Sequence, residues 1–366
     1  MDKKNTEAKN GLGFSYFYKM KCCLLLLLFF FTLHCSAQSN FKLFLVGDAG
    51  DDDLAGETLD SLKANIHRSS NSALIFLGDN CYRNYPLQYR GFDSSRITQK
   101  RILSQLSILD NYKGAAYFVP GNHDWWNTTN FNKGKHHLQM EESFIEKNLA
   151  VNKSIQNNNQ VFLPQHGSPG PAVVELNENK ICVIFIDTDW LLLLDEKRTP
   201  NLIKQVEKTF YHQLDSVMTV ADKKQQQIIV VAHHPIKAHY NLFNRKVKHP
   251  QIFTRVKMSL MGYPSYQKMA TQLQTIFEKH HRVIFASGHV HALQYYNTGN
   301  VQYIVSGSGS KTLRKKEINP PSTTCEYRVW NEEGFFVLNF ENKKTEVQLF
   351  HNRGLKNTLI DVLETK

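Results

Sequence analysis

The sequence predicts an α/β protein, because short apolar runs alternate with longer segments of helical spacing along most of its 366 residues. Hydrophobic residues make up 41% and aromatic residues 11% of the chain, which is enough for a large core. The apolar runs are rich in Val, Ile and Phe and are bounded by Gly, Asp, Asn or Pro. Such runs are typical of strands buried on both faces of a sheet.

Residues 1–37 have the layout of a secretory signal peptide and are set apart from the fold. An apolar run at residues 22–33 follows Lys21, and a small-residue cleavage site ends at Ala37. The run has 12 residues, too few to span a bilayer comfortably. We therefore expect a secreted or periplasmic protein that has no stable membrane insertion after cleavage.

Lipidation of Cys35 is the less favoured alternative, because His34 stands where a lipoprotein signal needs a small residue. The segment before Met20 is long for the start of a leader, so translation from Met1 or from Met20 stays open.

The chain that follows residue 37 is basic, with 39 Lys and Arg against 31 Asp and Glu, a net charge of +8. This charge suits an anionic substrate such as a phosphate ester, although solubility alone would also explain it. No basic run is dense enough to predict a nucleic-acid partner. The basic segment 241–261 is interpreted as an excursion over the surface. The three remaining cysteines, Cys81, Cys182 and Cys325, do not make a disulfide framework.

The predicted strands of the α/β part are the apolar runs at residues 41–46, 73–77, 115–119, 181–186, 227–232 and 282–287. Helical spacing falls between them, at residues 54–67, 95–110, 201–219 and 265–280. After residue 290, closely spaced strand patterns predict an antiparallel sheet that closes the same domain, at residues 292–297, 301–307, 334–340 and 345–350. No linker and no internal repeat interrupts the chain, so residues 38–366 are predicted to form one domain.

Five of these strands end in polar loops that carry Asp, Asn or His. The loops are Gly47-Asp48-Ala49-Gly50, Gly78-Asp79, Gly121-Asn122-His123-Asp124, His233-His234-Pro235 and Gly288-His289-Val290-His291. Because the carboxyl ends of strands in open α/β sheets are where ligands bind, we expect these loops to converge.

The donor types in these loops point to metal ions. Carboxylates, an amide oxygen, imidazoles and the phenol of Tyr82 suit hard or borderline cations, and the lack of a Cys pair argues against a structural zinc site. Each motif taken alone also fits an ordinary turn. Seven donors are too many for one catalytic ion that keeps an open position, so the set predicts two ions that share a carboxylate.

The motifs GDAG at 47, GDNCY at 78, GNHD at 121, VVAH at 230 and GHVH at 288 resemble the signature of the calcineurin-like metallophosphoesterases. Within them, the chain resembles the small, tartrate-resistant purple acid phosphatases. The resemblance implies a four-layer α/β/β/α sandwich of two mixed sheets flanked by helices. It also implies an acid phosphatase that hydrolyses small-molecule phosphomonoesters by attack of a metal-bound hydroxide.

Gly50 and Tyr82 carry the narrower resemblance. Most related enzymes have Asp-x-His in the first motif, and this chain has Gly50 in place of that His. Tyr82 stands where the purple acid phosphatases place a tyrosinate, and a phenolate favours trivalent iron. The alternative is that Tyr82 only packs against its loop.

The resemblance implies an iron(III) site formed by Asp48, Asp79, Tyr82 and His291. It implies a second site, for divalent iron, zinc or manganese, formed by Asp79, Asn122, His233 and His289. Asp79 would bridge the two ions.

Three further histidines lie in or near these motifs. His123 matches a catalytic His that contacts the phosphate or protonates the leaving alkoxide. His239 is a candidate substrate-binding residue, although its spacing is not a clean match, and His234 is expected to be structural. Trp125 and Trp126 either wall the pocket or pack in the core.

Two other functions remain open. The first is a phosphodiesterase or nucleotide pyrophosphatase on the same scaffold, against which Gly50 and Tyr82 count. The second is a secreted phosphate-binding or adhesion protein on an inactive enzyme scaffold, which should have lost at least one ligand.

Overall fold

The computed structural model describes residues 40–82, 92–126, 128, 130–149, 160–193, 200–239, 261–313, 326–341 and 344–364. Residues 40–366 form one compact unit. The predicted leader at 1–37, the segment 240–260 and Cys325 lie outside the described residues. No helix within the described part of the chain is both long enough and apolar enough to cross a membrane.

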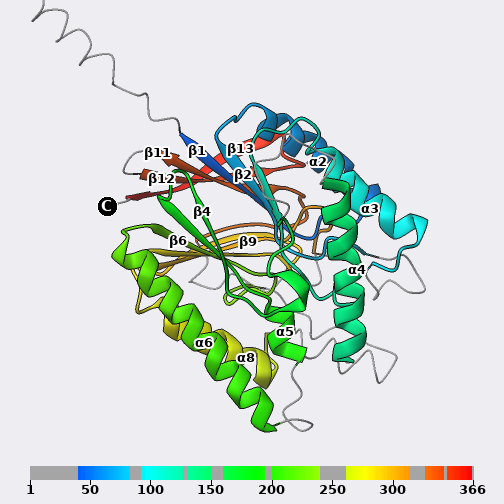
Figure 1. Cartoon of the computed structure of the whole chain (residues 1–366). Helices are drawn as coiled ribbons and strands as arrows, with labels where there is room; N and C mark the ends of the chain where they lie inside the picture. Colours follow the sequence, from blue (N-terminus) through cyan, green and yellow to red (C-terminus); the bar gives the residue numbers. More distant parts are fainter. Residues whose placement is uncertain are drawn as a thin grey trace, which may run out of the picture. The chain divides into compact units, whose positions relative to one another are not determined.

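Two mixed β-sheets lie face to face, with helices on their outer faces (Figure 1). The first sheet has the strand order β13-β12-β11-β1-β2-β3. Its strands are β1 (Phe41–Val46), β2 (Ser72–Phe76), β3 (Ala115–Phe118), β11 (Phe335–Glu341), β12 (Lys344–His351) and β13 (Lys356–Glu364). Strands β1, β2 and β3 are parallel, and β11, β12 and β13 are added antiparallel beside β1.

The second sheet has the order β10-β8-β9-β7-β6-β5-β4. Its strands are β4 (Ala172–Leu176), β5 (Ile181–Phe185), β6 (Gln227–Val231), β7 (Val283–Ser287), β8 (Leu293–Asn297), β9 (Val301–Ser306) and β10 (Tyr327–Val329). Strands β5, β6, β7 and β9 run parallel, and β4, β8 and β10 pair antiparallel with their neighbours.

Helices cover the outer face of each sheet (Figure 1). Those on the side of the first sheet are α2 (Asp52–His67), α3 (Arg96–Ser107) and α4 (Phe131–Leu149). Those on the side of the second are α6 (Pro200–Lys223) and α8 (Pro264–Phe277), with the short α5 (Thr188–Leu193) near the start of α4. The 3₁₀ turn η1 (Gln165–Gly167) precedes β4.

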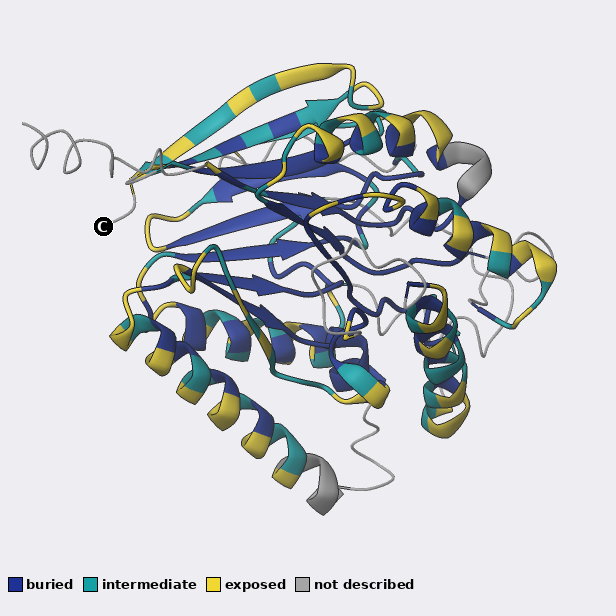
Figure 2. Cartoon of the chain, turned by 45° about the horizontal axis from the view of Figure 1, so that its top comes forward, coloured by how far each residue is buried: buried dark blue, intermediate teal, exposed yellow. Residues whose placement is uncertain are grey.

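The alternation of side chains along each strand builds two separate hydrophobic layers. In β1, Leu43 and Leu45 face the second sheet, whereas Phe44 and Val46 face the helices. Because both faces are covered, the central strands are apolar at most positions, with few polar residues such as Lys42 in β1 and Gln302 in β9. Figure 2 shows the result: the central strands are buried and the exposed residues lie on the outer surfaces of the helices and on the sheet edge at β13.

The prediction of two mixed sheets flanked by helices is confirmed. The prediction that the strands after residue 290 form an antiparallel sheet is wrong, because they are divided between the two mixed sheets. Strands β8 and β9 join the second sheet, with Val301 opposite Val283 in a parallel pair, and β11 returns to β1 in the first sheet. Strands β8 and β9 are neighbours in sequence and pair with each other, but the pairings of β9 with β7 and of β11 with β1 cannot be read from a local pattern.

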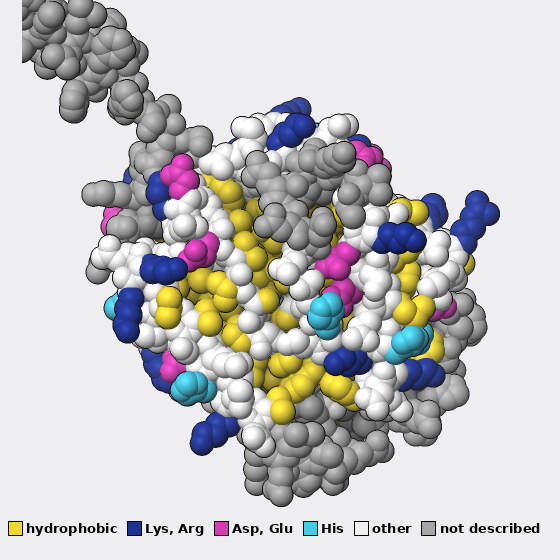
Figure 3. All heavy atoms as spheres, in the orientation of Figure 1, with side chains coloured by type: hydrophobic (Ala, Val, Ile, Leu, Met, Phe, Trp, Pro, Cys, Tyr) yellow, Lys and Arg dark blue, Asp and Glu magenta, His cyan; other side chains and the backbone are white. Residues whose placement is uncertain are grey.

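Basic side chains do not gather into one patch on the face seen in Figure 3. Among the coloured, described residues, Lys and Arg lie scattered between apolar and uncharged groups. The positive charge is therefore spread across this face.

Candidate metal centre

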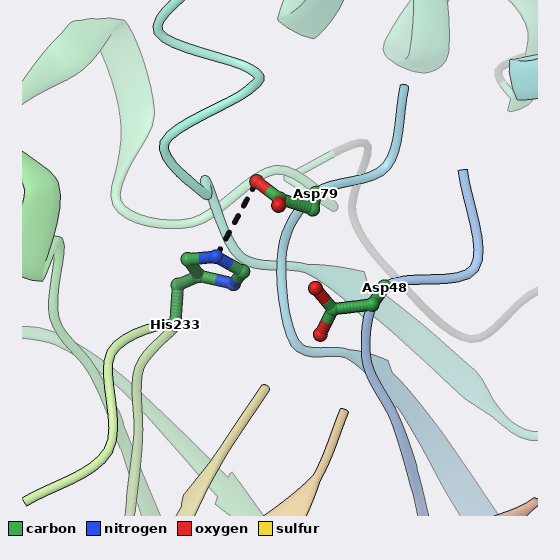
Figure 4. A group of neighbouring side chains, drawn as sticks. All are labelled: Asp48, Asp79 and His233. Atoms are coloured by element: carbon green, nitrogen blue, oxygen red, sulfur yellow. Dashed lines mark ion pairs between the residues drawn. The ribbon is translucent and has the colours of Figure 1, made fainter. Parts of the chain in front are cut away.

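The loops that follow β1, β2, β3, β6 and β7 bring all seven predicted donor side chains together. Asp48, Asp79 and His233 each offer one ligand atom, and these three atoms lie within 4.8 Å of one another. Figure 4 shows the three side chains pointing toward one another from different loops. The side chains are buried, so this part of the chain holds two carboxylates and an imidazole away from water.

The Tyr82 hydroxyl is the centre of a first group of donors. It lies 2.7 Å from Asp48 Oδ1, 3.0 Å from Asp79 Oδ2 and 3.3 Å from His291 Nε2. His291 Nε2 is also 3.4 Å from Asp48 Oδ1. These four residues are the ones predicted for the first metal.

The Asn122 amide oxygen is the centre of a second group. It lies 3.1 Å from His233 Nε2 and 2.9 Å from His289 Nδ1. His233 Nε2 is in turn 3.3 Å from Asp79 Oδ1. Asp79 therefore faces the first group with Oδ2 and the second with Oδ1.

The backbone orients the His233 ring. Its Nδ1 lies 2.9 Å from the Leu77 carbonyl oxygen, so Nδ1–H donates there and Nε2 faces Asp79 and Asn122. A backbone carbonyl on the far ring nitrogen is the usual way in which a protein orients a metal-binding imidazole.

Three of the seven residues have left-handed backbone conformations that glycine favours. The φ angles are 58° at Asp48, 54° at Asp79 and 67° at His289. Each such residue costs on the order of 1 kcal/mol and persists only where its surroundings hold it. The Asp48 N–H donates to the Gly78 carbonyl at 2.9 Å, and the Ser310 hydroxyl donates to the Asp48 carbonyl. Backbone strain of this kind clusters at functional sites.

Gly50 lies against the loop that carries Tyr82. A Cβ atom at residue 50 would be 2.5 Å from backbone atoms of Asp79, Asn80 and Cys81. The Tyr82 N–H also donates to the Gly50 carbonyl at 3.0 Å. No side chain fits at residue 50 while the backbone of residues 79–81 follows this path. The loop that carries Tyr82 therefore occupies the space that a His at residue 50 would need.

Asp124 ties the second and third loops together, a role that the sequence analysis missed. Its carboxylate accepts hydrogen bonds from the N–H groups of Gly121 at 2.7 Å, Cys81 at 3.2 Å and Asn80 at 3.3 Å. Burial raises the pKa of Glu141 well above its usual range, and Asp124 adds to the effect. Burial raises the pKa of Asp124 as well, and the three backbone N–H groups oppose that rise by stabilising its carboxylate.

His233 and Asp79 shift each other's pKa values. Burial alone would lower the pKa of His233, but the charge and hydrogen bond of Asp79, with smaller contributions from Asp48 and the Leu77 carbonyl, together raise the pKa to about 9. Burial would raise the pKa of Asp79, but His233 and then His123 lower it well below its usual range. Without a metal ion, the pair is therefore an imidazolium and a carboxylate at neutral pH.

His123 lies beside the centre, and its backbone N–H donates to Asp79 Oδ1 at 2.8 Å. Its ring packs on the Tyr82 ring with centroids 4.5 Å apart, and Nε2 is 4.0 Å from Asp79 Oδ2. Its buried Nδ1 has no hydrogen-bond partner among the described residues. Burial lowers the pKa of His123 to about 4, against the opposing charge of Asp79.

Neither His234 nor His239 belongs to the two donor groups described above. His234 is fully buried, with Nδ1 3.0 Å from Thr188 Oγ1, and it packs on the His289 ring. The backbone of His239 is held by Gln294, which accepts from its N–H at 2.8 Å and donates to its carbonyl at 3.0 Å.

The two tryptophans differ in position. Trp125 is fully buried and donates Nε1–H to Asp187 at 2.7 Å, so it is a core residue. Trp126 is half-buried and stacks on His137, with ring centroids 3.8 Å apart.

Lys311 is a second residue that the sequence analysis missed. Its Nζ lies 3.4 Å from the centroid of the Tyr82 ring. It follows the run Gly307-Ser308-Gly309-Ser310. This run contains only small residues typical of turns and none of the Asp, Asn or His side chains that marked the other loops.

A family model described as calcineurin-like phosphoesterase matches residues 41–293. Among solved structures, the chain is similar to GAP50, described as the anchor in the inner membrane complex of Plasmodium, with 17% identity over 90% of each chain and a TM-score of 0.57. It is similar to PhoD with 9% identity over 90% of this chain and 70% of that one, and a TM-score of 0.52. A dimetal phosphatase from Danio rerio has 13% identity over 89% and 99% of the two chains and a TM-score of 0.49. No curated protein matches the sequence.

Gly50→Ala should displace the Tyr82 loop. We expect a loss of about 1–3 kcal/mol in unfolding free energy from overpacking, together with a reduced metal content. Urea denaturation and elemental analysis measure the two effects. Gly56→Ala in α2 is the control, because a Cβ there meets nothing within 4 Å and should stabilise the helix by about 0.5–1 kcal/mol. A metal content equal to wild type in Gly50→Ala would show that the Tyr82 loop accommodates a Cβ at residue 50, against this prediction.

Metal binding should depend on pH through His233. Below pH 9 a metal ion must displace the proton on His233. This group alone should therefore make Zn²⁺ affinity rise about tenfold per pH unit between pH 6 and 9. Chelator competition measures the slope, and His233→Gln should lower the slope by about one proton. His351→Gln removes an imidazole that pairs with Glu332 at 2.6 Å on β12 and should keep the wild-type slope. An unchanged slope in His233→Gln contradicts the assignment.

Proposed function

The chain belongs to the calcineurin-like phosphoesterase family, and we propose that it is a secreted acid phosphatase with two metal ions that hydrolyses phosphomonoesters. Metal-dependent hydrolysis of phosphoesters is the activity of the family. The finer assignment rests on one observation: the Tyr82 hydroxyl lies between Asp48 and Asp79 where the backbone at Gly50 leaves no room for a His.

The two donor groups suit two different ions. Two carboxylates, a phenol and an imidazole in the first group favour a hard trivalent ion, for which we propose iron(III). An amide oxygen, two imidazoles and a carboxylate in the second suit divalent iron, zinc or manganese. When bound, two such ions supply positive charge for the phosphoryl oxygens and lower the pKa of water.

The chain's own contribution is to orient these donors before substrate arrives. Asp79 offers one oxygen to each group, and the His289 N–H donates to Asp48 Oδ2 at 2.7 Å, which turns Oδ1 toward Tyr82. Phosphoryl transfer depends mainly on such positioning and on neutralising charge.

We assign His123 the role of substrate contact. With a pKa of about 4 the ring is neutral above that pH, so it donates a hydrogen bond to a phosphate oxygen. A bound phosphate dianion would raise the basicity of the ring and let it deliver a proton to the leaving alkoxide. His239 remains a candidate for a second phosphate contact.

Two alternatives have distinct consequences. A phosphodiesterase or pyrophosphatase on this scaffold would prefer diesters. A non-catalytic role has a parallel in GAP50, which is described as an anchor and shares the fold. The complete set of seven donors supports catalysis over that role.

The test of the proposed function is a substrate panel on metal-loaded protein. We expect p-nitrophenyl phosphate to be hydrolysed faster than bis(p-nitrophenyl) phosphate, with an optimum below pH 7. A preference for the diester, or activity only above pH 8, would overturn the phosphatase assignment. Full metal content without hydrolysis of either ester would favour the non-catalytic role.

Tyr82→Phe tests the iron–phenolate assignment directly. A phenolate on iron(III) gives a visible charge-transfer band, so the iron-loaded wild type should be coloured. The Phe variant keeps the ring but removes the oxygen donor, and it should lose the band and bind iron more weakly. Visible absorption and iron analysis measure both effects. Tyr112→Phe removes another buried hydroxyl, which is hydrogen-bonded to Ser72 Oγ at 2.8 Å, and this variant should keep the colour. The same band in Tyr82→Phe would make Tyr82 a packing residue.

A further inference from the structure

Lys311 lies over the face of the Tyr82 ring. Its Nζ is 3.4 Å from the ring centroid, and the side chain is 25% exposed. An ammonium group at this distance from an aromatic face is attracted by the ring electrons. The attraction is stronger for a phenolate, whose ring carries added negative charge.

Asp51 links Lys311 to a second cation that holds the same tyrosine. Lys311 Nζ is 3.8 Å from Asp51 Oδ2, and Arg101 is 3.0 Å from Asp51 Oδ1. Arg101 is 1% exposed, and its other amino group donates to the Tyr82 carbonyl. Tyr82 is thus held at its ring by Lys311 and at its backbone by Arg101.

The loop that carries Lys311 is fastened to the first donor group. The Gly309 N–H donates to the Gly47 carbonyl at 3.0 Å, and the Ser310 hydroxyl donates to the Asp48 carbonyl. The Leu313 N–H donates to the His291 carbonyl at 2.8 Å. The position of Lys311 is therefore fixed relative to Asp48 and His291.

Before a metal binds, the first donor group carries the negative charge of two buried carboxylates, Asp48 and Asp79, and Lys311 brings a positive charge close to it. With a metal bound, Tyr82 as phenolate leaves the group one charge more negative than a neutral His would. Buried like charges are costly unless opposite charge lies near them.

We propose that Lys311 is a positioning residue for Tyr82, which fixes the ring and offsets the negative charge of its phenolate. The proposal rests on the proposed function, since it concerns Tyr82 as a metal ligand. A purely structural role is the competing explanation: the pair with Asp51 would then be an ordinary ion pair of small worth.

Lys311→Met separates these roles, because it keeps the unbranched side chain up to Cε and removes the ammonium group. Light absorption moves electron density from the phenolate ring to iron, and an ammonium over the ring stabilises the electron-rich ground state. Removing it should therefore shift the band of the iron-loaded protein to longer wavelength, on the order of 20 nm for a unit charge at this distance in a partly buried site. Lys311→Arg keeps the charge and should keep the band near its wild-type position.

Lys237→Met is the matched control. Lys237 Nζ lies 5.4 Å from the ring centroid of Tyr303, so this variant removes an equal charge and a similar contact from another tyrosine. Its band should not move.

The outcomes distinguish the two proposals. A coloured wild type whose band shifts in Lys311→Met but not in Lys237→Met supports the role of Lys311. A coloured wild type with an unmoved band in Lys311→Met overturns that role and leaves the proposed function standing. A colourless iron-loaded wild type overturns the iron–phenolate assignment, and the role of Lys311 with it.

Discussion

Negative charge buried at the ends of parallel strands is the constraint on which the rest of this centre depends. Asp48 and Asp79 are 0% and 2% exposed, and both contact one phenol. Charges taken out of water are tolerated only where opposite charge or hydrogen-bond donors replace the solvent. His233 does this for Asp79, and the His289 N–H does it for Asp48. Each loop that reaches the centre thus brings a donor or a cation to the two carboxylates.

The same constraint explains the backbone around the carboxylates. A Cβ at Gly121 would lie 2.3 Å from the Asp79 N atom and 2.5 Å from its Oδ1. Only glycine fits at residue 121. Without a Cβ there, the His123 N–H can donate to Asp79 Oδ1 at 2.8 Å. The left-handed conformations of Asp48 and Asp79 aim their side chains at a common point, at a cost in local stability. The hydrophobic layers on both faces of each sheet hold this strained arrangement in place.

The sequence was sufficient for the features that local chemistry determines. The apolar runs of β1, β2, β3, β6 and β7 are buried at nearly every position, so composition alone predicts them, and the polar loops that follow them carry the seven side chains that meet in the structure. Strand partners were not predictable, because β9 is paired with β7 and β11 with β1 by contacts distant in sequence. Asp124 and Lys311 were missed for the same reason, since each has its role through groups from other loops.

The departures from the common metallophosphoesterase pattern are physically linked. The backbone of residues 79–81 occupies the space that a side chain at residue 50 would need. The same backbone path places Tyr82 beside Gly50, whose carbonyl accepts from the Tyr82 N–H. A tyrosine oxygen in place of an imidazole would add negative charge beside two buried carboxylates, and the cation found over its ring is Lys311. Introducing a His at residue 50 alone would therefore not restore the common site, because the Tyr82 loop would have to move first.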